Sequence, residues 1–231
     1  MKTIGLIGGL SWESTVTYYR VINEYVQREL GGLHSAQILL DSVDLADFEN
    51  YQRNGYWEYA GQQVGLAAQK LQAAGADMVL ICSDTLHKVA DQVQEMIDIP
   101  LIHIAKVTAQ ACVDADVHAV GLLGTRYTMD DPTFKSYFVR RAVDVIVPHG
   151  DDRAFINDAI YQELCQGVVS KETKLALLDI IDSLEARGAQ AIVLGCTELD
   201  LIVEPADTIL PVLDSAALHA TAAARLALAG D

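Results

Sequence analysis

The sequence predicts an α/β protein of two similar lobes, each a parallel sheet flanked by helices. Short runs rich in Val, Ile and Leu alternate with longer segments that have helical periodicity. The short runs are apolar throughout, as expected of parallel strands that helices cover on both faces. Pieces of the first half of the chain also recur in the second half. Together these observations favour two lobes related by an internal repeat.

The first lobe is predicted to alternate strands with helices from the start of the chain. Strands are expected at residues 3–8, 36–43, 77–82 and 100–105, and helices at 11–30, 58–75 and 84–97. The segment 44–57 is expected to be a loop over the cleft between the lobes. With the C-terminal helix at 215–231, the first lobe would comprise residues 1–105.

The second lobe is predicted to repeat this order within residues 106–214. Strands are expected at residues 117–124, 142–148, 190–196 and 209–216, and helices around 130–141, as two segments within 152–187, and at the Ala-rich C-terminus. The two lobes would therefore have sheets of similar construction.

The internal repeat is the strongest single feature. Residues 71–85 (LQAAGADMVLICSDT) align without gaps with residues 184–198 (LEARGAQAIVLGCTE). Two further pairs of segments match in the same order at nearly the same spacing. Parallel strands resemble one another in composition, which could explain one match, but three matches in order favour duplicated lobes. Facing lobes would then place Ser83 and Cys196 on opposite sides of one cleft.

Composition and charge exclude several classes of function. The chain has 231 residues with 16 Lys and Arg against 32 Asp and Glu, a formal charge of −16 that disfavours nucleic acid and anionic membranes. No run approaches the roughly 20 apolar residues of a membrane span. The four cysteines lack zinc-site spacing, and the start of the chain does not have the pattern of a signal peptide. We therefore expect a cytoplasmic protein without a metal.

Chemistry is expected where polar residues follow the strands, because ligands of open parallel sheets bind beyond the carboxyl ends of the strands. Gly8 and Gly9, Ser83 and Asp84, and Cys196 occupy such positions. The glycines do not form the G-x-G-x-x-G fingerprint of dinucleotide binding. A small molecule other than a dinucleotide is therefore the expected ligand.

The motifs at four strand ends resemble those of the aspartate/glutamate racemase family, and the resemblance covers essentially the whole chain. The motifs are GGLSWEST at 8–15, CSDTLHK at 82–88, LLGTRYTM at 122–129 and GCTEL at 195–199. The family's first motif commonly reads Cys-Asn-Thr and stands here as Ser83-Asp84-Thr85, whereas its Gly-Cys-Thr-Glu motif is intact. The resemblance implies two α/β lobes, commonly a homodimer, no pyridoxal phosphate or other cofactor, and an amino acid substrate.

The resemblance further implies that Cys196 and Ser83 are the two acid/base residues. A free thiol has a pKa near 8.5, and a position just before a helix can lower it, so a Cys196 thiolate could abstract an α-proton. Ser83 is a far weaker acid and base than a thiol. Because the second-lobe cysteine of the family attacks the L-enantiomer, the chain is expected to act mainly on L-substrates. A buried core cysteine and a helix-capping serine are the structural alternatives.

The same resemblance implies that residues next to Ser83 and Cys196 bind the carboxylates of the substrate. Asp84 and Thr85 stand where the family binds the α-carboxylate, with Gly9, Thr125 and Thr197 as further candidates. An ionised Asp84 would repel a carboxylate. It could be protonated, could turn outward as a helix N-cap, or could have changed or abolished the activity. Thr125 and Thr197 could instead be turn or N-cap threonines.

The distal carboxylate of an acidic amino acid is expected to meet Gln52 and Arg53 in the 44–57 loop. An arginine offers a bidentate contact and supplies the positive charge that an acidic protein needs for an anionic substrate. A solvated surface arginine is the structural alternative.

The sequence thus predicts a cofactor-independent racemase of aspartate and glutamate. Two alternatives stay open. One is a decarboxylase of malonate-type acids, which needs only one cysteine. The other is an amino-acid-binding relative that has lost turnover, to which the unusual Asp84 lends weight.

Overall fold

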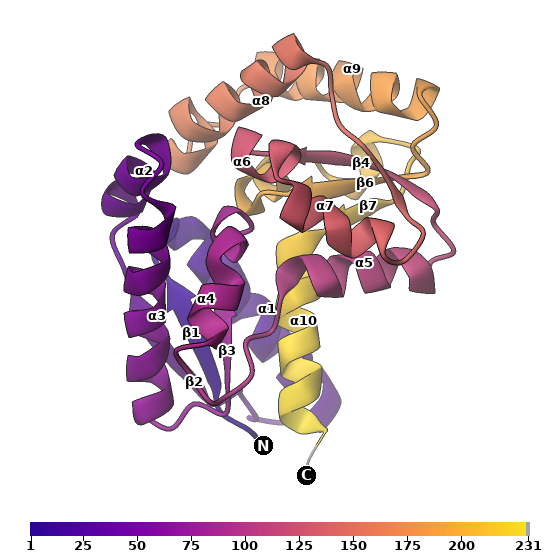
Figure 1. Cartoon of the computed structure of the whole chain (residues 1–231). Helices are drawn as coiled ribbons and strands as arrows, with labels where there is room; N and C mark the ends of the chain where they lie inside the picture. Colours follow the sequence, from indigo (N-terminus) through magenta and orange to yellow (C-terminus); the bar gives the residue numbers. More distant parts are fainter. Residues whose placement is uncertain (230–231) are drawn as a thin grey trace. The chain divides into compact units, whose positions relative to one another are not determined.

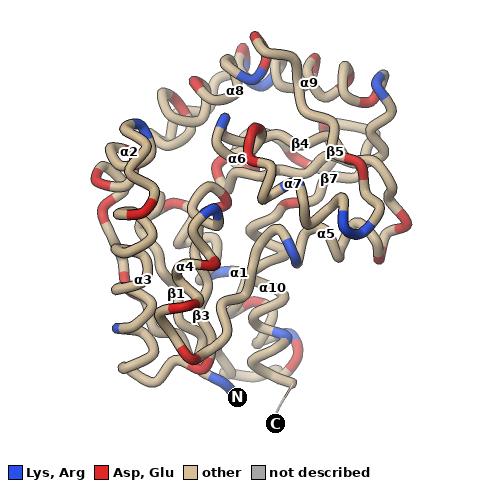
Figure 2. Tube along the Cα trace, viewed as in Figure 1, with Lys and Arg blue, Asp and Glu red and all other residues tan. Residues whose placement is uncertain are grey.

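The computed structural model of the chain describes residues 1–229, which divide into two compact units. Unit 1 contains Met1–His103 together with the chain from His219 onward, and unit 2 is Ile104–Leu218. None of the helices in the described residues has the length and apolar character that a bilayer span needs. Asp and Glu residues occur along the helices and loops of both units (Figure 2).

Unit 1 is a three-stranded parallel sheet with the strand order β2-β1-β3. Its elements are β1 (Ile4–Gly8), α1 (Trp12–Leu30), β2 (Ile38–Ser42), α2 (Leu45–Arg53), α3 (Trp57–Ala73), β3 (Met78–Ile81), the 3-10 helix η1 (Thr85–Val89) and α4 (Ala90–Gln94). Side chains of α3, β1 and β3 form one apolar core. The end of α10 (Ser215–Leu228) completes the unit, where the Lys2 amide donates to the Ala227 carbonyl.

Unit 2 is a four-stranded parallel sheet with the strand order β5-β4-β6-β7. Its elements are α5 (Ile104–Asp114), β4 (Ala119–Gly124), α6 (Arg126–Asp130), α7 (Pro132–Val139), β5 (Asp144–Ile146), α8 (Gly150–Gln162), η2 (Leu164–Gln166), α9 (Lys171–Ala186), β6 (Ala191–Gly195), η3 (Thr197–Leu201), η4 (Pro205–Asp207) and β7 (Val212–Asp214). In Figure 1 these strands lie between a layer of α8 and α9 and a layer of α5 and α7.

Alternate residues of β6 enter two different cores, which explains why the run is apolar throughout. Ile192 and Leu194 pack against α8 and α9, whereas Ala191 and Val193 pack against α5 and α7. A strand buried on both faces has no position at which a polar side chain reaches water. The prediction of parallel sheets flanked by helices is thus confirmed. The repeat also has a structural counterpart, because β1 pairs with β3 as β4 pairs with β6.

Two predicted strands are wrong in extent. The strand expected at 100–105 is a single bridge between Val79 and Leu101, because Ile104 and Ala105 are the buried first turn of α5. Likewise, the strand expected at 209–216 is only β7, and its last two residues begin α10. In both cases the apolar run crosses a strand–helix junction that periodicity cannot locate.

The helix expected at 84–97 is shorter than predicted, since η1 and α4 together end at Gln94. The loop expected at 44–57 is also wrong, because α2 occupies most of it. Asp44 caps α2 by accepting a hydrogen bond from the Ala46 amide at 3.0 Å. The expected end of the last helix at 231 lies outside the described residues.

A cluster of three histidines, of which His87 and His219 are buried, joins α10 to the segment just before α5. The Nε2–H group of His219 donates to the Ile102 carbonyl at 2.7 Å, and its Nδ1 accepts from the Tyr18 hydroxyl at 2.8 Å. The His87 ring lies against those of His219 and His103, with centroids 5.3 and 4.8 Å away. A carbonyl only accepts, so Nε2 of His219 carries a proton, and in the neutral ring Nδ1 is then the acceptor.

This cluster makes the stability of the protein sensitive to acid. Burial lowers the pKa of His87 to about 4 and lowers that of His219 well below its usual value. Their unfolded-state pKa is about 6.5, so the unfolded chain binds more protons below that pH and stability falls between about pH 6.5 and 4. We expect His87 alone to lower the unfolding free energy by about 2 kcal/mol at pH 5 relative to pH 7.

Chemical denaturation at pH 7 and pH 5 measures this loss. His87→Gln should be less stable at pH 7 but should lose about 2 kcal/mol less than the natural protein between the two pH values. His118 offers a matched control, because His118→Gln removes a histidine whose side chain is 70% exposed. An equal pH-dependent loss in all three proteins would contradict the assignment.

Candidate active site

Four residues directly after β3 form the candidate cluster of unit 1, namely Ser83, Asp84, Thr85 and His87. Because β3 pairs in parallel with β1, this cluster lies at the same edge of the sheet as Gly9. The Cys82 amide still donates to the Ile7 carbonyl at 3.0 Å, so the sheet pairing continues to the residue before Ser83. The carboxyl edge of the sheet therefore presents the residues that the motif predicts.

Ser83 is half-buried and makes two contacts with the turn that follows it. Its Oγ accepts a hydrogen bond from the Leu86 amide at 3.4 Å, and its carbonyl accepts from Nδ1–H of His87 at 2.7 Å. The contact with Leu86 is a capping interaction. Capping uses a lone pair of the oxygen and not the hydroxyl proton, so it is compatible with proton transfer by Ser83.

Asp84 is buried, and its side chain does not point into solvent. It is only 4% exposed, and its side chain does not cap η1. The proposal that Asp84 turns outward as a helix N-cap is therefore wrong. Thr85 is also buried. Both residues are thus in the protein interior beside Ser83.

Gly9 has a backbone conformation and surroundings that require glycine. Its φ is +77°, and a Cβ there would lie 2.0 Å from the Val43 carbonyl oxygen. The Gly9 amide donates to Thr15 Oγ1 at 2.8 Å. Glycine is therefore needed here because the backbone at Val43 passes too close for a side chain.

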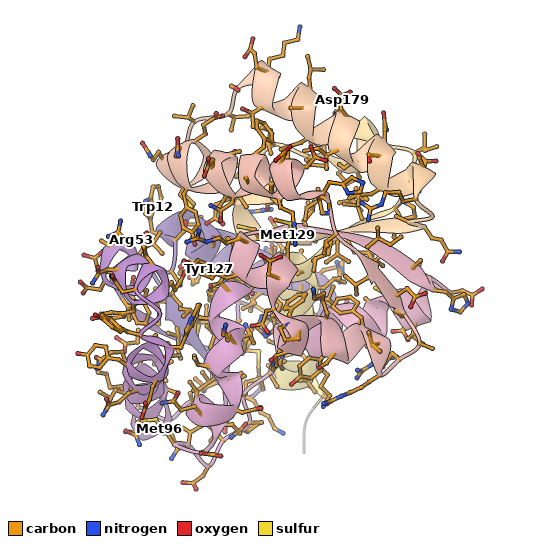
Figure 3. All side chains as sticks on the ribbon, turned by 45° about the horizontal axis from the view of Figure 1, so that its top comes forward. Trp12, Arg53, Met96, Tyr127, Met129 and Asp179 are labelled. Atoms are coloured by element: carbon orange, nitrogen blue, oxygen red, sulfur yellow. The ribbon has the colours of Figure 1, made fainter. Side chains whose placement is uncertain are left out.

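Gln52 and Arg53 lie on a helix, although the sequence predicted a loop. Gln52 is buried within unit 1, at 6% exposure. The Arg53 side chain, which is labelled in Figure 3, is 63% exposed and forms an i,i+4 ion pair with Glu49 at 3.7 Å. Because they are adjacent on α2, their side chains leave the helix about 100° apart. Part of the positive charge of Arg53 is therefore balanced within its own helix.

The candidate cluster of unit 2 comprises Thr125, Cys196, Thr197 and Glu198. Strands β4 and β6 are paired with Gly124 opposite Gly195, so Thr125 and Cys196 are the next residues on two adjacent strands. A Cβ on Gly124 would meet the Gly195 carbonyl at 2.6 Å, which explains the glycine at this crowded strand end. Thr125 directly precedes α6, and its Oγ1 accepts from the Thr128 amide at 3.3 Å, so it acts as the N-cap of this helix.

The thiol of Cys196 is hydrogen-bonded to a buried carboxylate. Its Sγ–H donates to Glu198 Oε2 at 2.9 Å, and the Thr197 hydroxyl donates to the same oxygen at 2.9 Å. Cys196 is 8% exposed and Glu198 is 4% exposed. The carboxylate thus accepts two hydrogen bonds from its immediate neighbours in the sequence.

The expected lowering of the Cys196 pKa is wrong. Burial and the adjacent Glu198 carboxylate raise the pKa of this thiol well above its usual value, although the Glu198 backbone amide acts in the opposite direction. Desolvation disfavours the thiolate, and a neighbouring negative charge repels it. The helix that follows is only the five-residue η3, so its dipole does not compensate.

A thiol with a raised pKa can still act as a base if its proton moves to a group within the site. Transfer from Cys196 Sγ to Glu198 Oε2 moves a proton over one existing hydrogen bond and leaves the total charge of the pair unchanged. The Glu198 amide then faces a thiolate, which an N–H group stabilises. The pair can therefore produce a thiolate without releasing a proton to water.

Glu198 and Tyr161 are the residues whose contribution sequence reasoning underestimated or missed. From the sequence, Glu198 could tune the proton affinity of the cysteine or have a simpler surface or capping role, and the simpler role was favoured. Tyr161 comes from α8, and burial followed by the proximity of Cys196 raises the pKa of its phenol. No local sequence signal identifies Tyr161, because it is 35 positions from the cysteine.

Comparison with known families gives one match that covers most of the chain. A protein-family model described as Asp/Glu/Hydantoin racemase matches residues 7–223. Among curated proteins, a broad-specificity amino-acid racemase, RacX of Bacillus subtilis (strain 168), is 22% identical over 150 residues. That alignment spans 65% of this chain and 64% of RacX.

Two solved structures are similar over nearly their whole length. A candidate Asp/Glu racemase from Yersinia pestis is 45% identical, with a TM-score of 0.92 and coverage of 99% of this chain and 100% of that one. An aspartate racemase homologue from Pyrococcus horikoshii OT3 is 30% identical, with a TM-score of 0.83 and coverage of 98% and 99%. Both similarities extend over the two units described above.

Proposed function

Because this chain belongs to the Asp/Glu/hydantoin racemase family, we propose that it racemises aspartate or glutamate without pyridoxal phosphate or another cofactor. It acts mainly on the L-enantiomer. Cys196 removes the α-proton, and Ser83 serves the opposite face of the α-carbon. Gly9, Gln52, Asp84, Thr85, Thr125 and Thr197 contact the substrate. The active protein is a homodimer, as the family resemblance implies, and we expect it to act in the cytoplasm.

The observation that carries the proposal is the hydrogen bond from Cys196 to Glu198. A structural cysteine in an apolar core does not need a buried carboxylate beside it, and placing one there is costly unless it has partners. A base for an α-proton does need a group that takes the thiol proton. The pair therefore supports a role in proton transfer more than a role in packing.

The reaction begins with the proton of Cys196 on Glu198. The thiolate takes the α-proton of the L-amino acid, which leaves a carbanion that hydrogen bonds to the substrate carboxylate stabilise. A proton then reaches the opposite face of the carbon from the Ser83 hydroxyl or from a water that it holds. The proton on Glu198 and the proton missing at Ser83 are exchanged with solvent, which restores the starting state.

The two proton donors differ greatly in strength, so the two enantiomers should behave differently in heavy water. We expect deuterium to enter the α-position of L-aspartate at least about 10-fold faster than that of D-aspartate, because a serine hydroxyl is a far weaker base than a thiolate. Proton NMR of each enantiomer with the purified protein measures both rates. Equal rates for the two enantiomers would contradict the assignment of Ser83 and Cys196 to opposite faces.

The same mixtures distinguish the alternative functions. Loss of optical rotation, followed by circular dichroism, is expected of a racemase. Ligand-induced thermal stabilisation without exchange or loss of rotation would indicate a binding protein and would overturn the proposal. Release of carbon dioxide from a malonate-type acid, without exchange on amino acids, would indicate the decarboxylase alternative.

A further inference from the structure

We propose that Arg126 binds the distal carboxylate of the substrate and makes the Cys196 cluster selective for dicarboxylic amino acids. This inference rests on the proposed function and replaces Arg53 with Arg126 as the residue that recognises the second negative charge. Two observations support it. Arg126 follows β4, which pairs with the strand β6 that leads to Cys196, and the guanidinium is hydrogen-bonded to an uncharged phenol, that of Tyr127.

Arg126 is placed at the site by the pairing of two strands. Gly124 lies opposite Gly195, so the chain after β4 and the chain after β6 leave the sheet side by side. Thr125 follows on one strand and Cys196 on the other, and Arg126 is the first residue of α6. Its backbone amide donates to Asn157 Oδ1 of α8 at 3.2 Å, which ties the start of α6 to α8. Arg126 is therefore two positions after Gly124, the residue that pairs with Gly195 just before Cys196.

The guanidinium of Arg126 is held by a phenol. One terminal nitrogen donates to the Tyr127 hydroxyl at 2.9 Å, and the guanidinium carbon is 4.9 Å from the Tyr127 ring centroid. Figure 3 labels Tyr127 beside Met129 on α6. An arginine side chain has five N–H donors in a planar fork, and this contact uses one of them. The remaining donors suit a carboxylate, and the Arg126 side chain is exposed and accessible to a ligand.

Tyr161 connects this cation to the cysteine. Its phenol interacts electrostatically with Cys196 and Glu198 and also with Tyr127, and it contributes to the environment of the Arg126 guanidinium as well. Arg126, Tyr127 and Tyr161 are thus close enough to the Cys196 cluster for their charges and dipoles to act on one another. A ligand whose α-carbon meets Cys196 would extend its side chain toward Arg126.

The charge balance of the site makes a cation necessary for an acidic substrate. The protein carries a formal charge of −16, and Glu198 places a buried carboxylate next to the reacting thiol. A second carboxylate on the ligand would be repelled unless a positive group met it. Arg53 forms an ion pair with Glu49 and Arg153 forms one with Asp130, whereas Arg126 is hydrogen-bonded to the Tyr127 phenol and Asp158 has the smallest of the effects that raise its pKa.

Substitution of Arg126 by glutamine, with Arg153→Gln as the matched control, tests the inference in the full-length protein. Deuterium exchange is measured on L-aspartate and on L-asparagine, whose side chain has nearly the same shape but no charge. We expect Arg126→Gln to lower kcat/KM for L-aspartate by about 10- to 100-fold, mainly through KM, because it removes a charge-assisted hydrogen-bonded contact. The value for L-asparagine should change less than about 3-fold, and Arg126→Lys should restore part of the loss.

A binding measurement separates this inference from the proposed function. Succinate has two carboxylates and no α-amino group, and acetate has one carboxylate. We expect succinate, but not acetate, to raise the melting temperature of the natural protein and of Arg153→Gln, and to do so much less in Arg126→Gln.

The inference is overturned if Arg126→Gln keeps both the KM for L-aspartate and the response to succinate. It is also overturned if Arg53→Gln produces the selective loss instead. If the natural protein exchanges no amino acid, the proposed racemase function fails. A loss of succinate binding in Arg126→Gln would then still support the anion-binding role of Arg126.

Discussion

Replacing Cys196 with alanine should reduce deuterium exchange into L-aspartate by about 10⁴-fold, to the level of the reaction without protein. The substitution removes the only atom of the Cys196 side chain that can hold the α-proton, and general base catalysis contributes up to about this factor. Proton NMR in heavy water measures the residual rate, and circular dichroism and thermal melting establish that the variant is folded.

The matched control is Cys165→Ala, which removes a neighbouring thiol of the same unit. Burial raises the pKa of Cys165 to about 12, so it is a thiol in similar surroundings that the mechanism does not use. This variant should keep exchange within about 3-fold of the natural protein. Cys196→Ser adds a second test, because serine preserves a donor to Glu198 but is a poor base. If Cys196→Ser exchanged at the rate of the natural protein, the Cys196 thiolate would not be the base.

Glu198→Gln should lower the exchange rate on L-aspartate by about 10²-fold near pH 7 and should change the shape of its pH dependence. Glutamine has nearly the size of glutamate and still offers a carbonyl oxygen to the Cys196 thiol, but it does not accept a proton. The thiol must then lose its proton to solvent. The rate of the variant should therefore rise with pH toward the thiol pKa, with a steeper slope than that of the natural protein.

The sign of the pKa change makes this prediction specific. The Glu198 carboxylate raises the pKa of Cys196, so its removal moves that pKa downward. If the only effect of the Glu198 carboxylate were to repel the Cys196 thiolate, Glu198→Gln would remove that repulsion and increase the exchange rate. A pH–rate profile from pH 6 to pH 10, with Glu198→Asp as the conservative variant, distinguishes these outcomes. A profile identical to that of the natural protein would mean that Glu198 has a structural role alone.

Some features of the fold could be predicted because they depend on local pattern. Strands such as β1, β4 and β6 are buried on both faces, and this requires an apolar residue at every position. The repeat was visible because equivalent strands have equivalent neighbours. Errors occurred where an apolar run crosses from strand to helix, as at Ile104 and Ser215, since burial alone does not distinguish the two conformations.

The candidate site was predicted in its residue types but not in its interactions. The motif around Cys196 identified a reactive position, yet the direction of its pKa was wrong. The hydrogen bond to Glu198 depends on the turn that η3 makes after β6, which residue order does not reveal. Arg53 was selected because its segment was expected to be a loop, and its pairing with Glu49 follows from the helix α2 that forms there.

The sequence by itself determined the two parallel sheets, the family, and the strand ends at which chemistry is expected. These follow from periodicity, duplication and motif, which are all properties of residue order. Only the tertiary structure decided the protonation behaviour of Cys196, the neutral state of the buried histidines and the surroundings of Arg126. These depend on burial and on groups from distant elements, such as Tyr161 of α8 and Ile102 before α5, because desolvation and hydrogen bonding act through space and not along the chain.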